Sequence, residues 1–152
     1  MSKRLPVILI IIAAAALASW FSFFSKEGEK VEPIAEKPGL IRVFTPRPNQ
    51  AISSPLIIEG EARGYWFFEA TFPVVLTNWD GLIIAQHYAQ AQDEWMTEEY
   101  VPFKAVLEFE SPAFPGADEN HFSRRGYLIL QKSNPSGLPE YDDALEIPIW
   151  FK

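Results

Sequence analysis

The chain has 152 residues, of which 48% are hydrophobic and none is cysteine, and its formal net charge is −7 at pH 7. This length allows one ordinary domain with a short appendage, and the apolar fraction is high enough for a folded core. The lack of cysteine excludes disulfides, thiolate nucleophiles, cysteine-ligated zinc and a bacterial lipid anchor on cysteine.

Residues 5–24 form an apolar run, LPVILIIIAAAALASWFSFF, without a charged residue. As an α-helix this run would be about 30 Å long, the thickness of the hydrocarbon core of a bilayer. Lys3 and Arg4 precede it, so the positive-inside tendency keeps residues 1–4 in the cytoplasm and exports the rest of the chain. The sequence therefore predicts one N-terminal transmembrane helix in a single-pass protein of the cell membrane, with an extracytoplasmic C-terminal domain.

A cleaved signal peptide is the alternative for this segment. The sequence Ala16-Leu17-Ala18 has the small-x-small pattern of a cleavage site after Ala18. The apolar run continues beyond this site through SWFSFF, which would leave an apolar new N-terminus. We therefore expect an uncleaved signal anchor. Both alternatives place the domain outside the cytoplasm.

Residues 25–38, SKEGEKVEPIAEKP, are charged and proline-bearing, which is typical of a solvated linker. The remaining domain, residues 39–152, contains eight Lys and Arg against sixteen Asp and Glu, a net charge of −8. An acidic domain repels phosphate backbones, so nucleic acid is not an expected partner. Solubility is the simplest explanation of this charge, and attraction to a cationic partner or to divalent ions at the cell surface is the alternative.

Alternation of apolar and polar residues dominates the domain, and no run of ten or more residues shows a helical period. Seven strands are predicted between turn signals, at residues 40–45, 55–62, 66–77, 82–89, 101–109, 126–132 and 145–151. Asp80-Gly81 predicts a tight hairpin after the third strand, and Pro148 places the last strand at a sheet edge. This pattern predicts an all-β fold, an Ig-like β-sandwich of about seven strands.

The stretch GYWFFEATFPV, residues 64–74, holds five aromatic residues. In one continuous strand, Trp66, Phe68 and Phe72 would share a face long enough to cross the core of a sandwich. We therefore expect these three side chains to be buried.

Three further residues of this stretch, Tyr65, Phe67 and Glu69, would lie on the opposite face of the same strand. Exposed aromatic side chains beside a charged one can form an interaction surface. Tyr65, Phe67 and Glu69 are therefore the candidate interaction patch. In the alternative, the two rings are covered by the loop at residues 46–50 or by Trp150.

Catalytic and metal-binding motifs are not found. His87 and His121, the two histidines, have no partner at metal-ligand spacing, and no serine lies in a nucleophile elbow. Acidic loops, including Asp142-Asp143, could offer oxygen ligands to calcium, but none has the order of an EF-hand loop. We predict no catalytic residue, no metal and no cofactor.

An ordered set of small, proline and aromatic residues runs through the domain: Ser54-Pro55, Gly60, Ala62, Gly64 and WFFEA at residues 66–70. With the strands on either side, this order resembles the immunoglobulin-like domain of bacterial spore germination, the second GerMN-associated domain, over residues 40–151. The resemblance implies an Ig-like β-sandwich, an exported or membrane-anchored bacterial protein, and no established enzymatic activity.

Together these observations predict a non-catalytic binding or adhesion module at the bacterial cell envelope. Residues 5–24 would anchor it to the membrane, its partner would be an envelope protein or a cell-wall polymer, and the ectodomain would be monomeric. One alternative is an accessory subunit of an envelope or germination-type complex. The other is a small cell-wall hydrolase, which would need paired carboxylates in a groove.

Overall fold

The computed structural model describes residues 34–152. The predicted cytoplasmic residues 1–4, the predicted transmembrane segment 5–24 and residues 25–33 of the predicted linker lie outside the described residues. Among residues 34–152, no helix has the length and hydropathy needed to cross a membrane.

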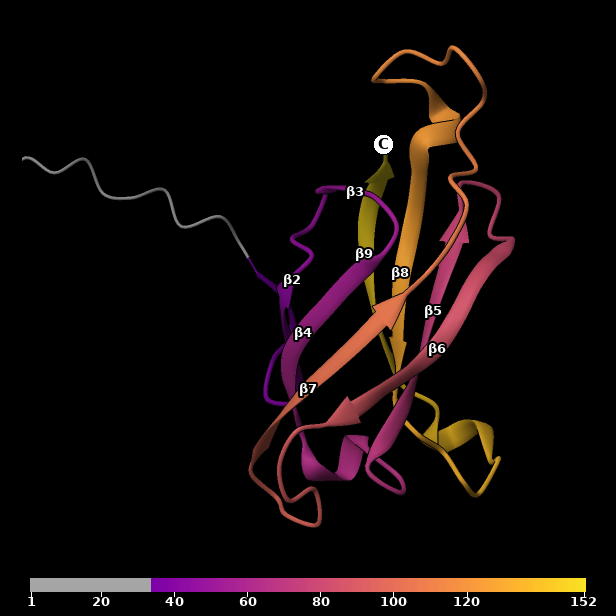
Figure 1. Cartoon of the computed structure of the whole chain (residues 1–152). Helices are drawn as coiled ribbons and strands as arrows, with labels where there is room; N and C mark the ends of the chain where they lie inside the picture. Colours follow the sequence, from indigo (N-terminus) through magenta and orange to yellow (C-terminus); the bar gives the residue numbers. More distant parts are fainter. Residues whose placement is uncertain (1–33) are drawn as a thin grey trace, which may run out of the picture. The chain divides into compact units, whose positions relative to one another are not determined.

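The described chain consists of strands joined by loops and three short 3-10 turns (Figure 1). The strands are β1 (Ala35–Lys37), β2 (Ile41–Thr45), β3 (Ala51–Ile52), β4 (Leu56–Arg63), β5 (Thr71–Asn78), β6 (Ile83–Ala91), β7 (Tyr100–Leu107), β8 (Arg125–Gln131) and β9 (Ala144–Phe151). The 3-10 turns are η1 (Gly64–Trp66), η2 (Phe122–Arg124) and η3 (Pro139–Tyr141). All nine strands belong to one sheet in the order β1-β2-β4-β7-β6-β5-β8-β9-β3.

This single sheet curls into two layers that face each other. The layer of β1, β2, β4 and β7 is joined to the layer of β6, β5, β8, β9 and β3 by two residue pairs, Gln90 opposite Lys104 and Ala91 opposite Phe103. The far edges also meet, because Lys37 of β1 forms an ion pair with Asp143, just before β9. The all-β prediction is confirmed, and the predicted sandwich of about seven strands is formed by one curled sheet of nine strands.

The two strands that the sequence does not predict are β1 and β3. β1 lies inside the predicted linker 25–38 and pairs antiparallel with β2, Ala35 opposite Val43, so the folded domain begins before residue 39. β3 has two residues and pairs parallel with the end of β9, Ile52 opposite Phe151. Strands this short carry too few residues for alternation to be recognised.

The core lies between the two layers and is filled by alternating side chains. β4 and β7 bury every second residue along their length, as their sequences predict. Phe72 of β5 meets Phe103 of β7 across the core, edge to face, with ring centroids 4.9 Å apart. The largest fully buried side chains are Trp66, Phe72, Phe151, Ile41, Ile58, Leu76, Leu107, Leu128, Leu130, Ile147, Ile149 and Val43.

The predicted hairpin is confirmed, whereas β9 is not the edge strand that Pro148 predicts, because β3 pairs with the end of β9. Gly81 has a φ of 78°, and the Asn78 N–H donates to the carbonyl of Leu82 at 3.0 Å, which closes the predicted hairpin between β5 and β6. In β9 the N–H of Trp150 donates to the carbonyl of Gln50 at 3.0 Å. The nitrogen of Pro148, two residues earlier, therefore faces the same outer edge, where a strand tolerates proline.

Candidate functional site

The predicted third strand does not form as one piece. After β4 the chain makes the turn η1 (Gly64–Trp66) and then a two-residue turn, and β5 begins only at Thr71. The N–H of Phe68 donates to the carbonyl of Thr71 at 2.9 Å, and the reverse bond is 3.1 Å long. Between them Glu69 and Ala70 both have positive φ, 50° and 62°, as in a type I′ turn.

These two turns disrupt the alternation on which the predicted faces depend. Trp66 and Phe72 are fully buried, as expected, but Phe68 is exposed over almost half of its surface. Phe67 is only 4% exposed and packs edge to face on Phe72, with ring centroids 5.2 Å apart. The prediction of a buried Phe68 was therefore wrong.

The predicted interaction patch is not contiguous. Tyr65 and Glu69 are exposed, whereas Phe67 is part of the core. The prediction was wrong for Phe67, because the 3-10 turn rotates its ring inward. The alternative, with both rings covered by the loop at residues 46–50 or by Trp150, is wrong for Tyr65, which is half exposed, whereas Phe67 is covered and packs on Phe72.

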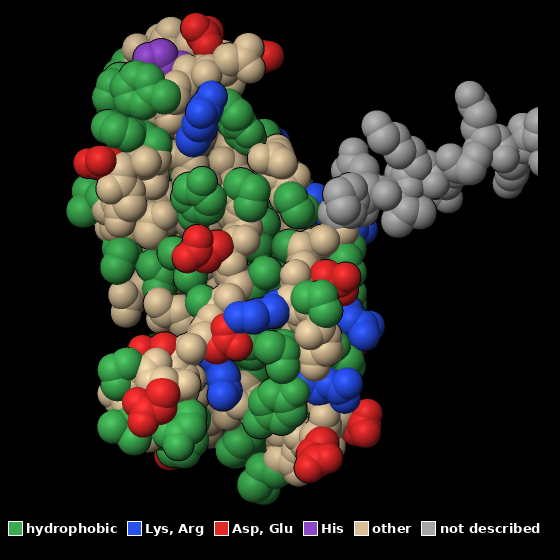
Figure 2. Space-filling view, turned by 180° about the vertical axis from the view of Figure 1, so that it is seen from behind, with side chains coloured by type: hydrophobic (Ala, Val, Ile, Leu, Met, Phe, Trp, Pro, Cys, Tyr) green, Lys and Arg blue, Asp and Glu red, His purple; other side chains and the backbone are tan. Residues whose placement is uncertain are grey.

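A different set of aromatic side chains is exposed at the other end of β5. Trp79, on the β5–β6 hairpin, meets the ring of Phe122 edge to face at a centroid distance of 4.8 Å. Phe122 contacts Phe114 at 5.6 Å and His121 at 4.4 Å. Trp79, Phe114 and Phe122 are each 42–49% exposed. We call Trp79, Phe114, His121 and Phe122 the aromatic cluster. Figure 2 shows hydrophobic side chains beside a histidine at this end of the domain.

The loop between β7 and β8 is fixed by hydrogen bonds that hold the aromatic cluster in place. The buried Ser123 Oγ accepts from the N–H of Phe114 at 3.0 Å and lies 2.8 Å from His121 Nδ1. The guanidinium of Arg124 donates to the carbonyls of Ala117 at 3.0 Å and Phe151 at 3.2 Å. The exposed rings therefore project from a positioned loop tied to the end of β9.

The pair of His121 and Ser123 does not have the arrangement of a catalytic dyad. Ser123 has no exposed surface, so a substrate cannot reach its hydroxyl. His121 Nδ1 also accepts from the N–H of Ser123 at 3.3 Å, which caps the turn η2. This pair is best explained as support for the loop.

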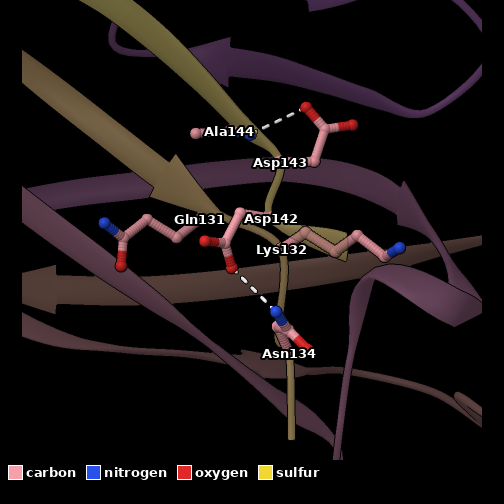
Figure 3. A pocket seen from close by; sticks show the side chains of 6 residues that line it. All are labelled: Gln131, Lys132, Asn134, Asp142, Asp143 and Ala144. Carbon is pink, nitrogen blue, oxygen red and sulfur yellow. Dashed lines mark hydrogen bonds between the residues drawn. The ribbon is translucent and has the colours of Figure 1, made fainter. Parts of the chain in front are cut away.

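A depression of about 610 Å³ lies beside the β8–β9 loop (Figure 3). Asn134 and the two carboxylates that line it already have partners within the protein. Asn134 donates to Asp142 at 2.7 Å and to the carbonyl of Leu138 at 2.8 Å, and Asp143 is the ion-pair partner of Lys37. Carboxylates committed in this way stabilise the loop and leave no pair free for general acid and base work.

Metal ligands are not assembled in the described part of the chain. Within residues 34–152, no group of three His, Cys, Asp or Glu side chains lies close enough to hold a metal ion. His87 lies on β6, whereas His121 lies in the loop that leads to η2. The calcium alternative at Asp142 and Asp143 therefore gains no support from the geometry.

Charged side chains on the outer face of β2, β4 and β7 pair with each other. Arg42 donates to Glu61 at 2.9 Å, and Lys104 donates to Glu59 at 2.7 Å. The guanidinium of Arg42 also lies 4.2 Å from the ring centroid of Tyr100. Because these charges are compensated within the domain, this face is a weaker candidate for binding than the aromatic cluster.

Sequence reasoning missed the aromatic cluster because its members come from two segments. The Asp80-Gly81 signal placed Trp79 on a hairpin turn, where a large ring has little chance of burial. Phe114 and Phe122 belong to a long loop without periodicity, and only the folded structure brings them to Trp79. The usable signal was an aromatic residue inside a turn motif.

An all-β domain built from one curled sheet of two facing layers defines the class, an Ig-like β-domain. The chain belongs to the family of the immunoglobulin-like domain of bacterial spore germination, which its sequence matches over residues 40–119. The predicted resemblance is confirmed, and the match ends within the β7–β8 loop, before residue 151. Comparison with curated proteins and with solved structures finds no match.

Proposed function

We propose that the protein is a non-catalytic binding module of the bacterial cell envelope and that the aromatic cluster is its contact surface. The observation that carries this proposal is the exposure of Trp79, Phe114 and Phe122 at one end of the domain. Aromatic side chains dominate interface hot spots because they bury a large area with few rotatable bonds. Membership in a family without established enzymatic activity supports the same role.

In this proposal residues 5–24 anchor the protein in the cell membrane, residues 1–4 stay in the cytoplasm, and the domain is extracytoplasmic. The partner is an envelope protein or a cell-wall polymer, and the domain works as a monomer. Its acidic balance, a net charge of −8 over residues 39–152, disfavours nucleic acid as the partner. Protease treatment of intact cells tests the location, since an exported domain would be degraded and a cytoplasmic one would survive.

A second candidate is an accessory subunit of an envelope or germination-type complex, which family membership favours. In that case the aromatic cluster would contact another subunit and the transmembrane segment would contribute to assembly. The hydrolase alternative lacks support, because the carboxylates in the depression beside the β8–β9 loop are already hydrogen-bonded or ion-paired.

Co-sedimentation with purified cell-wall sacculi and photo-crosslinking in membranes would test the contact surface. We expect the double variant Trp79→Ala/Phe122→Ala to lose at least nine-tenths of the captured partner while it stays folded. The matched control is Tyr65→Ala/Phe68→Ala, which removes two similarly exposed rings at the opposite end of β5. Equal loss of capture in both double variants would exclude the aromatic cluster as the specific site.

A further inference from the structure

The pairing between β6 and β7 stops early although both strands continue. It consists of Gln90 opposite Lys104 and Ala91 opposite Phe103. In the same register Tyr88 would lie opposite Val106, and this pair is not made. Figure 1 shows the two strands running apart from this point. Seven of the nine residues of β6 therefore have no pairing partner on β7.

Hydrogen bonds at the closed end of this junction show which backbone groups of β6 face the gap. The N–H of Gln92 donates to the carbonyl of Pro102 at 2.8 Å, whereas the N–H of Ala91 donates to the carbonyl of Ala70 at 2.8 Å. Backbone groups alternate in direction along a strand, so even-numbered residues of β6 face β7. The N–H and C=O groups of Gln86 and Tyr88 thus point into the gap, where no strand pairing in the described chain engages them.

The facing edge of β7 is open in the same way. The N–H of Gly64 donates to the carbonyl of Glu99, just before β7, at 3.1 Å. The backbone N–H and C=O groups of odd-numbered residues of β7 therefore face β4. The backbone groups of Val106 and Glu108 therefore face β6 across the gap. The edges of β6 and β7, each with backbone donors and acceptors outside any strand pairing, therefore face each other.

The β6 edge also lacks the features that normally prevent strand addition. Its sequence from Ile83 to Ala91, IIAQHYAQA, contains no lysine, no acidic residue and no proline. Natural sheets protect exposed edges with such residues or with bulges, and the irregularity in β6 lies at its far end, near Ile83. An unprotected edge of this length favours pairing with another chain.

The gap forms a groove on the surface. One part, of about 420 Å³, is lined by Gln86, His87, Val106, Leu107 and Glu108. A second part of about 270 Å³ continues toward the closed end and is lined by residues that include Tyr88 and Lys104. His87 pairs with the buried Val74 and so points to the inner side of the groove, whereas Tyr88 points to the outer side.

We infer that this groove binds an extended segment of a partner polypeptide as an added strand between β6 and β7. The main chain of the segment would be hydrogen-bonded to Gln86 and Tyr88 on one side and to Val106 on the other. Because β6 and β7 are antiparallel, the segment runs antiparallel to one of them and parallel to the other.

The side chains around the groove specify the chemistry of the segment. Its inward positions meet Leu107 and the ring of His87, which favours small apolar residues. Its outward positions lie between Tyr88, Val106 and Glu108. Lys104 is already paired with Glu59, so the acidic Glu108 favours lysine or arginine on the segment. A second copy of this chain fits poorly, because each domain carries a net charge of −8.

Backbone amide exchange, followed by NMR on the full chain in detergent micelles, tests this inference. The probe is a synthetic nine-residue peptide that alternates valine with lysine or threonine. We expect exchange at Gln86, Tyr88 and Val106 to slow at least tenfold when the peptide is added. The same peptide N-methylated at alternate residues keeps the side chains but loses the backbone donors, and we expect no protection from it.

Proline substitution separates the groove from the rest of the sheet. Gln86→Pro removes an N–H that faces the groove and no bond of the β5–β6 ladder, so the thermal transition should stay while peptide affinity falls at least tenfold. Glu146→Pro is the matched control, since the N–H of Glu146 faces the outer edge of β9, and it should bind the peptide as the parent does. Trp79→Ala/Phe122→Ala should also bind it normally, which distinguishes this site from the aromatic cluster.

Three results would overturn the inference. The first is unchanged exchange at Gln86, Tyr88 and Val106 at millimolar peptide. In the second, these amides are already protected without peptide and lose protection on dilution, which would assign the groove to a second copy. In the third, protection without peptide disappears when residues 1–33 are removed, which would assign the groove to the chain's own N-terminal segment.

Discussion

Aromatic residues lie at both ends of β5, but those at one end are mostly buried and those at the other are exposed. At the start of β5, the turn η1 and the Glu69-Ala70 turn fold Trp66 and Phe67 into the core. At its end, Trp79 remains outside and packs on the rings of the β7–β8 loop. Eight residues of strand, about 26 Å, separate the two ends.

The difference comes from what each end is attached to. The first end lies under the loop between β6 and β7, where the N–H of Gly64 donates to the carbonyl of Glu99 and a Cβ at residue 64 would overlap the carbonyl oxygens of Thr97 and Trp95. The second end consists of a hairpin tip and a long loop, which have no further layer to cover them. An aromatic residue is therefore a core residue or a surface residue according to the coverage of its turn.

The largest expected effect separates neighbours within the first end. Phe67→Ala and Phe72→Ala should each lower the free energy of unfolding by about 3–5 kcal/mol, because each removes a buried ring from a packed pair. Phe68→Ala should change it by less than about 1 kcal/mol, since this ring is half exposed. Urea unfolding monitored by circular dichroism measures all three. A loss in Phe68→Ala as large as that in Phe67→Ala would show that the strand is continuous after all.

The second end should respond weakly in stability. Trp79→Ala and Phe122→Ala each remove an exposed edge-to-face pair, which is worth about 0.5–1.5 kcal/mol. The same unfolding measurement gives the value, and a double-mutant cycle isolates the contact between the two rings. Losses above about 3 kcal/mol would mean that the aromatic cluster is a second core instead of a contact surface.

The tight turn at the first end should be improved by substitution. Glu69 and Ala70 both have positive φ, a conformation that costs a residue with a Cβ roughly 1 kcal/mol and that asparagine and glycine adopt readily. Glu69→Asn/Ala70→Gly should therefore raise the free energy of unfolding by about 1 kcal/mol. Asn78→Gly is a suitable control, because the Asn78 side chain accepts from the N–H groups of Asp80 and Leu82 and its removal should destabilise the hairpin.

The smallest expected effect concerns metal. Neither end of β5 presents an assembled ligand group, in line with the geometry of residues 34–152 as a whole. Chelator treatment should leave the thermal midpoint of the domain unchanged within error in differential scanning calorimetry. A drop of several degrees that calcium restores would reveal a site on the acidic loops.

The strands that alternate for at least five residues were predictable from the sequence, because burial of one face imposes a period of two. β4, β7 and β9 follow this pattern almost residue by residue. The region around Phe67 was not predictable, because the turns at Gly64 and Glu69 use residues without a turn signature. Glu-Ala replaces the Asn-Gly that normally announces a type I′ turn, so alternation was extended through a place where the chain reverses.

The sequence predicted the type of side chain in the candidate site but not which residues form it. Aromatic residues at a surface were expected, but the predicted Tyr65, Phe67 and Glu69 fail as a group because Phe67 is buried. Trp79 and Phe122 are 43 residues apart in the chain and meet only because the β5–β6 hairpin and the β7–β8 loop lie at the same end. Contacts of this kind depend on sheet order, which local patterns do not encode.

The lengths of β1 and β3 determine how many further chains can pair with this sheet. These two strands form the outer edges of the sheet, and they have three and two residues. Edges this short offer too few backbone groups to template another chain, and the part of β9 that β3 leaves uncovered carries Glu146 and Pro148, residues that protect a strand edge. A segment inserted between β6 and β7 would form hydrogen bonds with both strands and leave no new unpaired edge. The resulting complex is therefore a closed one-to-one assembly instead of a growing fibre.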